Sequence, residues 1–202
     1  MKIDFKKTLP SYKARRGVFE VVDVPAMQYL MVDGGGGPEA ESFKRAIETV
    51  YPVAYTLKFM SKNDLGKDYV VPPMEALWWA EDWSVFTTGY DRSRWEWSVM
   101  LMTPDWITRE MFDAAVEKVA AKKNRPPGLD ELRLGTLAEG RCVQTLHLGP
   151  FADEGPVLKR MHEQFIPEQG LKMTGKHHEI YFSDFRKTAP EKLRTLLRQP
   201  VA

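Results

Sequence analysis

The chain has 202 residues, of which 43% are hydrophobic and 28% charged, a composition typical of a soluble globular protein that can bury a core. Its 29 Lys and Arg residues against 28 Asp and Glu leave a formal net charge of +1, so no overall field attracts nucleic acid or an anionic membrane. The single cysteine, Cys142, excludes a disulfide framework within the chain, and no stretch approaches the roughly 18 apolar residues of a membrane span.

The stretch MKIDFKKTLPSYKARR, with which the sequence begins, lacks the apolar run of a signal peptide. We therefore expect a cytoplasmic protein. The balanced charge also leads us to expect no nucleic-acid or membrane partner, so any partner has to be recognised by a local site.

The first part of the chain predicts strands followed by a helix. Residues 17–32 carry Val, Phe and Tyr in loose alternation, which indicates one strand, or two strands broken at Pro25, before a glycine turn. From Phe43 to Tyr55, apolar residues recur at i, i+3 and i+4, which predicts a helix with one buried face. Pro52 is expected to kink or restart this helix.

The middle of the chain predicts two strands and a second helix. Residues 68–80 and 95–102 have strand character and are joined by a polar segment. Residues 103–123 predict a helix, with acidic residues early and lysines late, as the helix dipole favours. The sequence RPPG at 125–128 is the best candidate for a boundary.

After this boundary the pattern of elements starts again. Strands are predicted around 132–134 and 139–148, a helix at about 156–165, and a strand at 176–184, KHHEIYFSD. A final helix is predicted after Thr188, where Thr-Ala-Pro-Glu has capping-box spacing and Leu193, Leu196 and Leu197 supply an apolar face.

The two halves resemble one another in the order of their signals. MVDGGGGPEAESFKRAIETVYP and LHLGPFADEGPVLKRMHEQFIP share a strand end, a glycine turn, an acidic helix start, a Lys-Arg pair and a closing proline. We therefore predict one α+β domain over residues 1–202, built from approximate repeats at 18–124 and 129–200. Each repeat would be a strand-helix-strand-strand module, and the two would form an antiparallel sheet around a central ligand groove.

Several familiar chemistries are excluded by spacing. The glycines at 34–37 run into Pro and Glu instead of the Lys-Ser/Thr pair of a phosphate loop. His162-Glu163 has no second histidine four positions later, so it does not form a zinc-protease motif. Cys142 and His147 fall on opposite faces of an extended strand, which removes the simplest Cys-His pair. No motif for a cofactor or a metal ion remains.

The strand at 176–184 carries a carboxylate, Glu179, at its centre. Alternation predicts two faces, one with His177, Glu179, Tyr181 and Ser183 and the other with His178, Ile180 and Phe182. The second face is expected to be apolar and packed. In the simplest interpretation the first face is wet and Glu179 is merely solvated, whereas in the alternative it is the polar centre of a pocket.

All six tryptophans lie between Trp78 and Trp106, which indicates either an aromatic core or a site for a planar ligand. Alternation places Trp95 and Trp97 opposite Met100 and Met102. Trp78 and Trp79 point to opposite sides of their strand, so one of them can line a pocket. Methionines there would add an adaptable wall.

Four segments together resemble the GyrI-like small-molecule-binding family, namely GKHHEIYFSDFRKTAPEKLRTLLRQP, MEALWWAEDW, WEWSVMLMTPDWIT and LHLGPFADE. The resemblance covers about residues 18–200 and is closest to the stand-alone branch that lacks a DNA-binding domain. It implies a pseudo-two-fold pair of strand-helix-strand-strand modules around a groove. In relatives fused to transcription regulators, a glutamate on the late strand meets planar, cationic drugs within an aromatic pocket, and Glu179 is the matching position.

Some stand-alone relatives are described as hydrolases, similar to cyclopropanoid cyclohydrolases, that open the cyclopropane ring of planar hydrophobic DNA-alkylating compounds. The resemblance therefore implies a detoxifying hydrolase in which Glu179 activates water. Tyr181, and Tyr55 as a second candidate, would position water or donate a hydrogen bond to the developing phenolate. The expected ligand-binding residues are Trp79, Trp95, Trp97, Met100, Met102 and His177.

Two other functions stay open. A non-catalytic protein that binds or sequesters planar cationic drugs would need the same aromatic pocket and a single carboxylate. A protein-binding inhibitor of DNA gyrase, as the family name suggests, would need an exposed acidic or aromatic surface.

Overall fold

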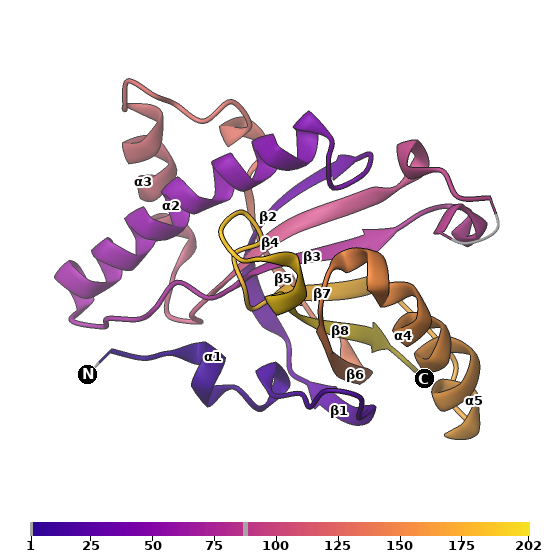
Figure 1. Cartoon of the computed structure of the whole chain (residues 1–202). Coiled ribbons are helices and arrows are strands. Elements are labelled where there is room, and N and C mark those ends of the chain that lie inside the picture. The colour runs from indigo at the N-terminus through magenta and orange to yellow at the C-terminus, as the bar shows by residue number, and fades with distance from the viewer. Residues whose placement is uncertain (1, 87–88) are drawn as a thin grey trace.

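The computed structural model describes residues 2–86 and 89–202, in which eight strands form one antiparallel sheet in the order β1-β6-β8-β7-β3-β4-β2-β5 (Figure 1). The strands are β1 (Glu20–Val24), β2 (Met27–Gly35), β3 (Met74–Trp79), β4 (Glu96–Thr103), β5 (Arg133–Leu137), β6 (Gly140–Leu148), β7 (His177–Tyr181) and β8 (Arg194–Pro200). The α-helices are α1 (Phe5–Thr8), α2 (Glu41–Leu65), α3 (Arg109–Ala120), α4 (Glu154–Arg160) and α5 (Ile166–Glu168), and the π-helical turn Met161–Phe165 joins the last two. Short 3₁₀ turns lie at Pro10–Tyr12, Trp83–Phe86, Arg92–Arg94, Leu129–Glu131, Phe151–Asp153 and Pro190–Lys192.

The sheet consists of two equivalent halves joined at its centre. The first half runs β2-α2-β3-β4 and the second β6-α4-α5-β7-β8, and the strand orders β2-β4-β3 and β6-β8-β7 meet where β3 pairs with β7. The strand that precedes each half pairs with the other half, because β1 lies beside β6 and β5 lies beside β2. The predicted α+β fold with a pseudo-two-fold duplication is therefore confirmed.

Helix α2 covers one face of the first half of the sheet. Its buried side chains include Phe43, Ala46, Ile47, Val50, Val53, Ala54 and Leu57, which pack on residues of β2, β3 and β4. Burying each large apolar side chain contributes about 1.5–3 kcal/mol, so this face outweighs the roughly 3 kcal/mol that an internal proline costs. Pro52 accordingly lies inside one continuous helix of 25 residues and does not restart it.

The second helical group covers the same face at the other end of the sheet. Val99, Ala76, Glu179 and Leu197 lie side by side across β4, β3, β7 and β8, so they share a face. Val99 and Ala76 pack with α2, whereas Leu197 packs with Met161 of the π-helical turn. The centre of this face, over β3 and β7, lies between the two helical groups and next to the loop that follows β7 (Figure 1). We call this region the groove.

The opposite face of the sheet is covered by the N-terminal segment, residues 2–17. Leu9 and Tyr12 pack on Ile180 and Leu196, and Phe5 packs on the neighbouring cluster that contains Met100. The expectation of an apolar second face on β7 holds for Ile180 but is wrong for His178, which is fully buried between two glutamates.

The predicted final helix is wrong, because residues Arg194–Pro200 form the central strand β8 and only a 3₁₀ turn precedes it. Leu196 faces Ile180 and Tyr12 on one side of the sheet, and Leu197 faces Val143 and Met161 on the other. A strand buried on both faces lacks polar alternation, so its leucines reproduce the i, i+3, i+4 spacing of a helix.

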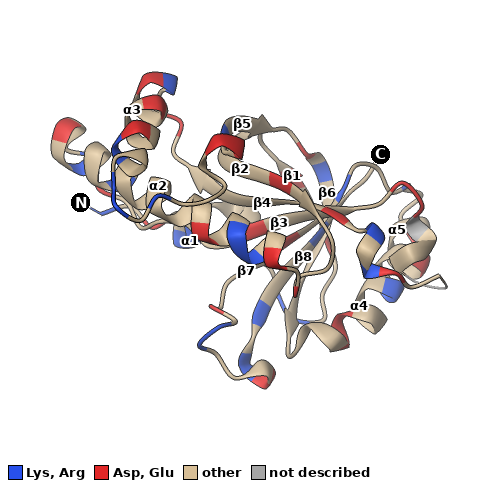
Figure 2. Ribbon diagram, turned by 90° about the horizontal axis from the view of Figure 1, so that it is seen from above, with Lys and Arg blue, Asp and Glu red and all other residues tan. Residues whose placement is uncertain are grey.

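Acidic and basic residues are interspersed over the ribbon, in agreement with the balanced composition (Figure 2). Within the described part of the chain, no helix is both long enough and apolar enough to span a membrane.

Candidate functional site

The central strands place three side chains of β7 beside three of β3 on the groove face. Trp78 lies opposite His177, Ala76 opposite Glu179, and Met74 opposite Tyr181. Because side chains alternate along a strand, Trp78 and not Trp79 joins Glu179 in the groove.

A chain of hydrogen bonds runs through this row. The Trp78 indole Nε1 donates to the Tyr181 hydroxyl at 3.2 Å, and that hydroxyl donates to Glu179 Oε2 at 2.6 Å. The Glu179 side chain is 15% exposed, and its Oε1 lies 3.5 Å from Nε2 of His177. The indole can only donate and the phenol has one proton, so the chain has a fixed direction that ends on Glu179 as an acceptor. Burial, followed by the neighbouring Glu179 carboxylate, raises the pKa of Tyr181 well above its usual value.

A second carboxyl group, Glu154, faces the same region from the first residue of α4. Glu154 is only 5% exposed, and its Oε1 has no hydrogen-bond partner among the described residues. Burial and then the charge of Glu179 raise the pKa of Glu154 to about 10. At neutral pH Glu154 is therefore a neutral acid that can donate a proton, whereas Glu179 accepts hydrogen bonds.

Sequence reasoning missed Glu154. An acidic residue in the first turn of a helix usually faces solvent and complements the helix dipole. The available signal was the turn LGPFADEG, in which Glu154 stands between an aromatic residue and a helix that packs on the sheet.

Two histidines complete the polar part of the groove. The rings of His162 and His177 lie 6.2 Å apart in an edge-to-face arrangement. Burial and then the nearby His177 lower the pKa of His162 to about 4, so its imidazole is neutral near pH 7. Neither ring nitrogen of His177 has a hydrogen-bond partner in the described part of the chain, nor has Nε2 of His162. Buried polar atoms without partners mark a place where a bound molecule or water satisfies them.

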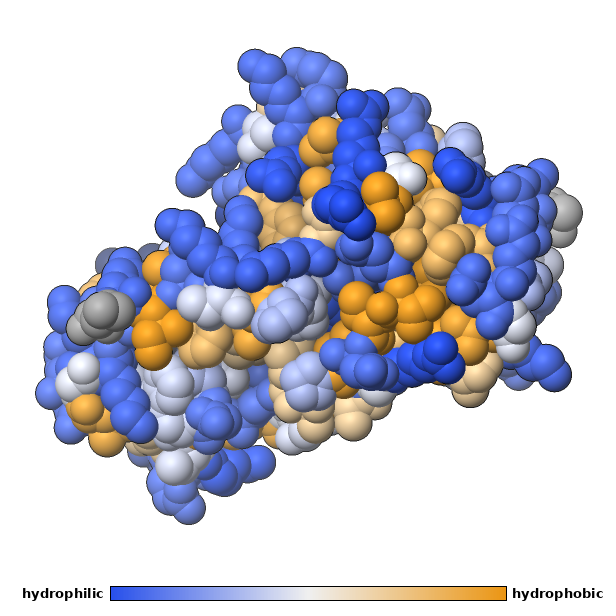
Figure 3. All heavy atoms as spheres, turned by 90° about the horizontal axis from the view of Figure 1, so that it is seen from below, coloured by the Kyte–Doolittle hydropathy of each residue, from blue (hydrophilic) through white to orange (hydrophobic). Residues whose placement is uncertain are grey.

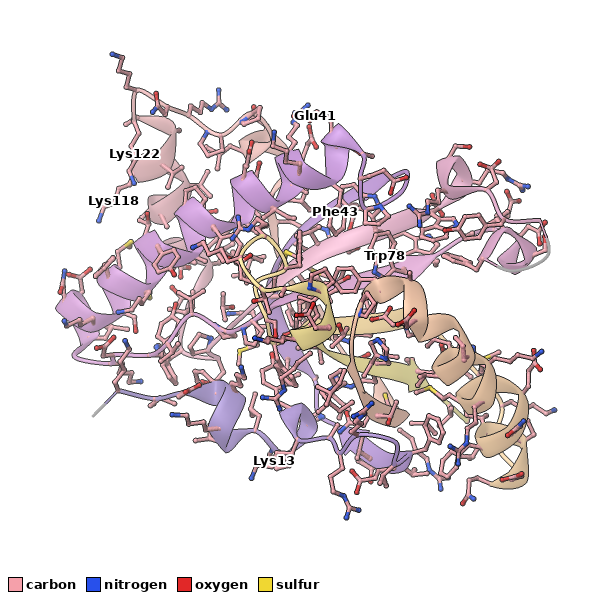
Figure 4. All side chains as sticks on the ribbon, viewed as in Figure 1. Lys13, Glu41, Phe43, Trp78, Lys118 and Lys122 are labelled. Carbon is pink, nitrogen blue, oxygen red and sulfur yellow. The ribbon has the colours of Figure 1, made fainter. Side chains whose placement is uncertain are left out.

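Aromatic rings surround these polar groups. Trp78 stacks on Phe43 of α2 with ring centroids 5.2 Å apart and meets Trp95 edge to face at 5.9 Å. Figure 4 shows Phe43 and Trp78 on the facing elements α2 and β3. Phe151, before α4, and Phe185, after β7, contact the Tyr181 ring at 5.7 and 6.2 Å. The groove therefore has a polar floor and aromatic walls, two of which come from loops.

A cavity of about 370 Å³ adjoins the groove beside Tyr181. Its lining includes Tyr181 and Phe185, together with Ile47 and Tyr51 of α2 and Met74 of β3. Glu179 does not line this cavity, but Tyr181, which does, donates the hydrogen bond to Glu179. The volume lies within the roughly 300–1,000 Å³ of small-molecule sites.

Of the tryptophans that we expect to bind the ligand, Trp97 lies in the core and Trp95 lies at the edge of the groove. Trp97 is 1% exposed, meets Phe43 edge to face at 5.1 Å and lies directly over Gly34, where a Cβ atom would come within 2.3 Å of the indole. Trp97 is therefore a core residue that requires glycine beneath it. Trp95 lies at the edge of the groove, because it contacts Trp78 and stacks on Phe86 at 4.7 Å.

Other expected site residues lie elsewhere. The sequence predicts that Trp79, Met100 and Met102 bind the ligand, but they lie on the opposite face of the sheet in a cluster with Tyr29 and Leu77. Alternation along β3 and β4 turns them away from Glu179, so this assignment is corrected. Tyr55 is 49% exposed and stacks on Tyr51 at 6.4 Å, and no contact between it and Glu179 is found among the described residues.

The described residues contain no group of three or more His, Cys, Asp or Glu side chains arranged to hold a metal ion. The chemistry that this chain's own residues offer is thus acid, base and hydrogen-bonding chemistry within an aromatic enclosure.

Comparison with known proteins agrees with this architecture. The model of the GyrI-like small molecule binding domain matches residues 18–202. An uncharacterized conserved protein from Listeria innocua is 41% identical with a TM-score of 0.90, and a hydrolase from Listeria innocua is 40% identical with a TM-score of 0.86. In both comparisons the alignment covers 100% of each chain.

More distant relatives share the fold alone. The C-terminal domain of EcmrR is 12% identical with a TM-score of 0.57, over 92% of this chain and 97% of that one. No curated protein sequence matches. The match over residues 18–202, with the duplicated modules and the groove that they enclose, places this chain in the GyrI-like small-molecule-binding domain family.

Proposed function

We propose that this protein is a hydrolase that opens the cyclopropane ring of planar hydrophobic DNA-alkylating compounds and thereby detoxifies them. The observation that carries the proposal is the pair of carboxyl groups in the groove, in which burial holds Glu154 protonated beside the acceptor Glu179. Titratable groups whose environments push their pKa values apart are a common basis for acid and base roles. The similarity to a Listeria innocua hydrolase at 40% identity supports the same class of reaction.

The proposed reaction adds one water molecule across the strained ring. Glu179 orients the water and takes one of its protons while the oxygen forms a bond to a cyclopropane carbon. The ring bond breaks, and its electrons pass through the conjugated dienone to the carbonyl oxygen, which becomes a phenolate. Glu154 donates its proton to that oxygen, which gives a neutral phenol. Transfer of the proton from Glu179 back to Glu154 restores the enzyme.

The surrounding residues support these two roles. Tyr181 holds Glu179 in one orientation through the 2.6 Å hydrogen bond, and Trp78 in turn holds Tyr181. The Phe151 and Phe185 rings pack against the Tyr181 ring and shield it from solvent on these sides, which strengthens its hydrogen bond to Glu179. Flat aromatic walls also favour a planar substrate. Tyr55 has no role in this arrangement.

A direct test is incubation with a cyclopropane-dienone compound, followed by loss of the dienone chromophore and by mass spectrometry of the hydrated product. Glu179→Gln and Glu154→Gln should each lower kcat by about 10²–10⁴-fold, because general acid and base catalysis contribute about that much. Glu41→Gln, on the exposed start of α2, is the matched control and should leave kcat unchanged (Figure 4). Full activity in both groove variants would disprove the proposed mechanism.

The second candidate function is sequestration of planar cationic drugs without turnover. It is favoured by one observation, the acceptor Glu179 enclosed by the rings of Trp78 and Tyr181. Fluorescence titration separates the two functions. A sequestering protein should prefer planar cations and lose this preference in Glu179→Gln, whereas a hydrolase should bind neutral dienones almost equally well in both forms.

A further inference from the structure

A second cavity, of about 420 Å³, lies away from the groove, between the N-terminal segment and the end of β7. The N-terminal segment, residues 2–17, precedes the part of the chain that the family model matches. It runs along the lower side of the molecule in Figure 1. This second cavity is therefore partly built from residues outside the family's common domain.

The walls of this cavity are strongly basic. Four cationic side chains line it, Lys6, Lys13, Arg15 and Arg194, against one acidic side chain, Glu20. Arg15 is neutralised, because its Nη2 lies 2.7 Å from Oε1 of Glu20.

The other three cations, Lys6, Lys13 and Arg194, make no ion pair among the described residues. Lys6 Nζ donates a hydrogen bond to the Phe182 carbonyl oxygen at 3.2 Å. The nearby Asp4 is held by Lys7 at 3.5 Å. Three positive charges therefore line one cavity without an ion-pair partner in the part of the chain that the structure describes.

The like charges in this cavity repel one another. Burial and then the nearby Arg194 lower the pKa of Lys6 from its usual value. An anion bound between these two side chains would reverse the second effect, since an opposite charge nearby favours the ammonium form.

Aromatic rings form part of the same cavity. Tyr12 and Phe182 meet edge to face with centroids 6.2 Å apart, and Lys6 Nζ lies 5.0 Å from the Phe182 ring centroid. From the side where the N-terminal segment lies, the surface shows strongly hydrophilic residues directly beside apolar ones (Figure 3). The cavity itself, which is lined by both cations and aromatic rings, suits a ligand that has both a charged group and a flat apolar part.

We propose that this cavity is a binding site for a small aromatic phosphate monoester. A phosphate monoester carries about −1.5 to −2 charges at neutral pH and three acceptor oxygens, which fits three unpaired cations better than a single carboxylate does. Arg194 offers the planar fork that binds phosphate oxygens in pairs, and Lys6 and Lys13 act as point charges. The aromatic part of the ligand contacts Phe182 and Tyr12.

This site is separate from the proposed hydrolase site. Phe182 follows Tyr181 directly and packs with Tyr12 and Ile180 on the opposite face of the sheet. The two sites therefore lie back to back across the end of β7, and binding can be measured without any turnover assay.

Isothermal titration calorimetry with phenyl phosphate, inorganic phosphate and phenol, at constant ionic strength, tests the proposal. Phenyl phosphate should bind saturably, inorganic phosphate more weakly, and phenol not measurably. Arg194→Gln and Lys13→Gln should each lower the affinity for phenyl phosphate by about tenfold or more, as expected for loss of a charge-assisted contact. Lys118→Gln and Lys122→Gln, exposed at the far side of the molecule near α3, are matched controls that should leave binding unchanged (Figure 4).

Two further measurements check that the variants fold and that the aromatic ring of Phe182 contributes to binding. Lys13 and Arg194 are both exposed, so circular dichroism should show that their variants fold normally. Phe182→Leu should reduce the preference for phenyl phosphate over inorganic phosphate while keeping the affinity for inorganic phosphate. The proposal is overturned if phenyl phosphate fails to saturate wild-type protein at millimolar concentration, or if the α3 controls weaken binding as much as the cavity variants.

Discussion

The two faces of the central sheet both bury charged groups, but the groups on the face opposite the groove are joined by shorter ion pairs. On the face opposite the groove, His178 lies 2.9 Å from Glu139 and 2.8 Å from Glu75 through its two ring nitrogens. Arg198 bonds Glu139 at 2.8 Å and the Ser11 carbonyl oxygen at 2.5 Å. Tyr12 donates to Glu75, so the N-terminal segment closes this network.

The electrostatics of the paired face follow from these contacts. Burial alone would lower the pKa of His178, but Glu139 and Glu75 outweigh it and raise that pKa to about 9. Burial likewise opposes ionisation of Glu139, but His178 and Arg198 hold its pKa at about 2. At neutral pH the cations His178 and Arg198 therefore lie beside an ionised Glu139.

In the groove, Glu154 Oε1, His162 Nε2 and both ring nitrogens of His177 have no hydrogen-bond partner among the described residues, and burial keeps Glu154 protonated instead of placing it in a close ion pair. Buried charges held in ion pairs of 2.8–2.9 Å stabilise one structure. A buried acid whose pKa is strongly shifted is instead typical of a functional site. We therefore assign stability to the His178 face and chemistry to the Glu179 face, although both occupy the same strand.

The largest expected effect is a fall in the free energy of unfolding when one partner is removed from the buried ion pairs of His178, Glu139 and Arg198. Arg198→Met should lower the free energy of unfolding by about 3–5 kcal/mol, because it leaves Glu139 charged, buried and short of a partner. Urea unfolding measures this. Arg109→Met is the matched control, since Arg109 pairs with Asp113 on the exposed face of α3 and should cost less than about 1 kcal/mol. Equal effects of the two substitutions would contradict the comparison.

The second largest expected effect is a gain in the free energy of unfolding, caused by replacing Glu154. The folded pKa of Glu154 is raised to about 10, above its unfolded value, so the folded state binds the extra proton and stability falls as pH rises between about 4.5 and 10. Glu154→Gln, which mimics the protonated form, should therefore stabilise the protein at pH 7 by an amount on the order of 3 kcal/mol. Thermal and urea unfolding from pH 5 to pH 9 should show a gain that grows with pH. A loss of stability at pH 7 would count against a protonated Glu154.

The smallest effect concerns Tyr181. Tyr181→Phe removes two hydrogen bonds but keeps the ring that Phe151 and Phe185 contact, so it should lower stability by only about 1–2 kcal/mol. Its turnover of a cyclopropane-dienone should fall more than its affinity, because Glu179 loses its orientation. Unchanged turnover would remove Tyr181 from the proposed mechanism.

Much of the fold could be predicted from local signals. The strands around Trp78 and Trp97, helix α2 and the duplicated order of elements follow from periodicity and turn residues. The strand β8 could not be predicted in this way, because a strand that is buried on both faces lacks the alternation of polar and apolar residues. Pro52 predicted an interruption because local propensity does not include the burial of α2 against the sheet.

The site was only partly predictable for a related reason. Alternation along β7 correctly grouped Glu179 with Tyr181 and His177, since these residues belong to one strand. The choice between Trp78 and Trp79 depends on the register between β3 and β7, and Glu154 reaches the groove from α4. Neither the register between strands nor the packing of a helix can be read from the spacing of residues in one segment.

The acid and base roles of the groove depend above all on the protonation state of Glu154 beside Glu179. Carbon-13 NMR of the glutamate side-chain carboxyl groups, with Glu154→Gln used for assignment, follows each titration between pH 3 and about pH 11. We predict one glutamate carboxyl that stays protonated through neutral pH and titrates near pH 10, and this signal should be absent from Glu154→Gln. If every glutamate carboxyl of the folded protein were ionised by about pH 6, the groove would hold two ordinary carboxylates and the acid and base roles would be contradicted.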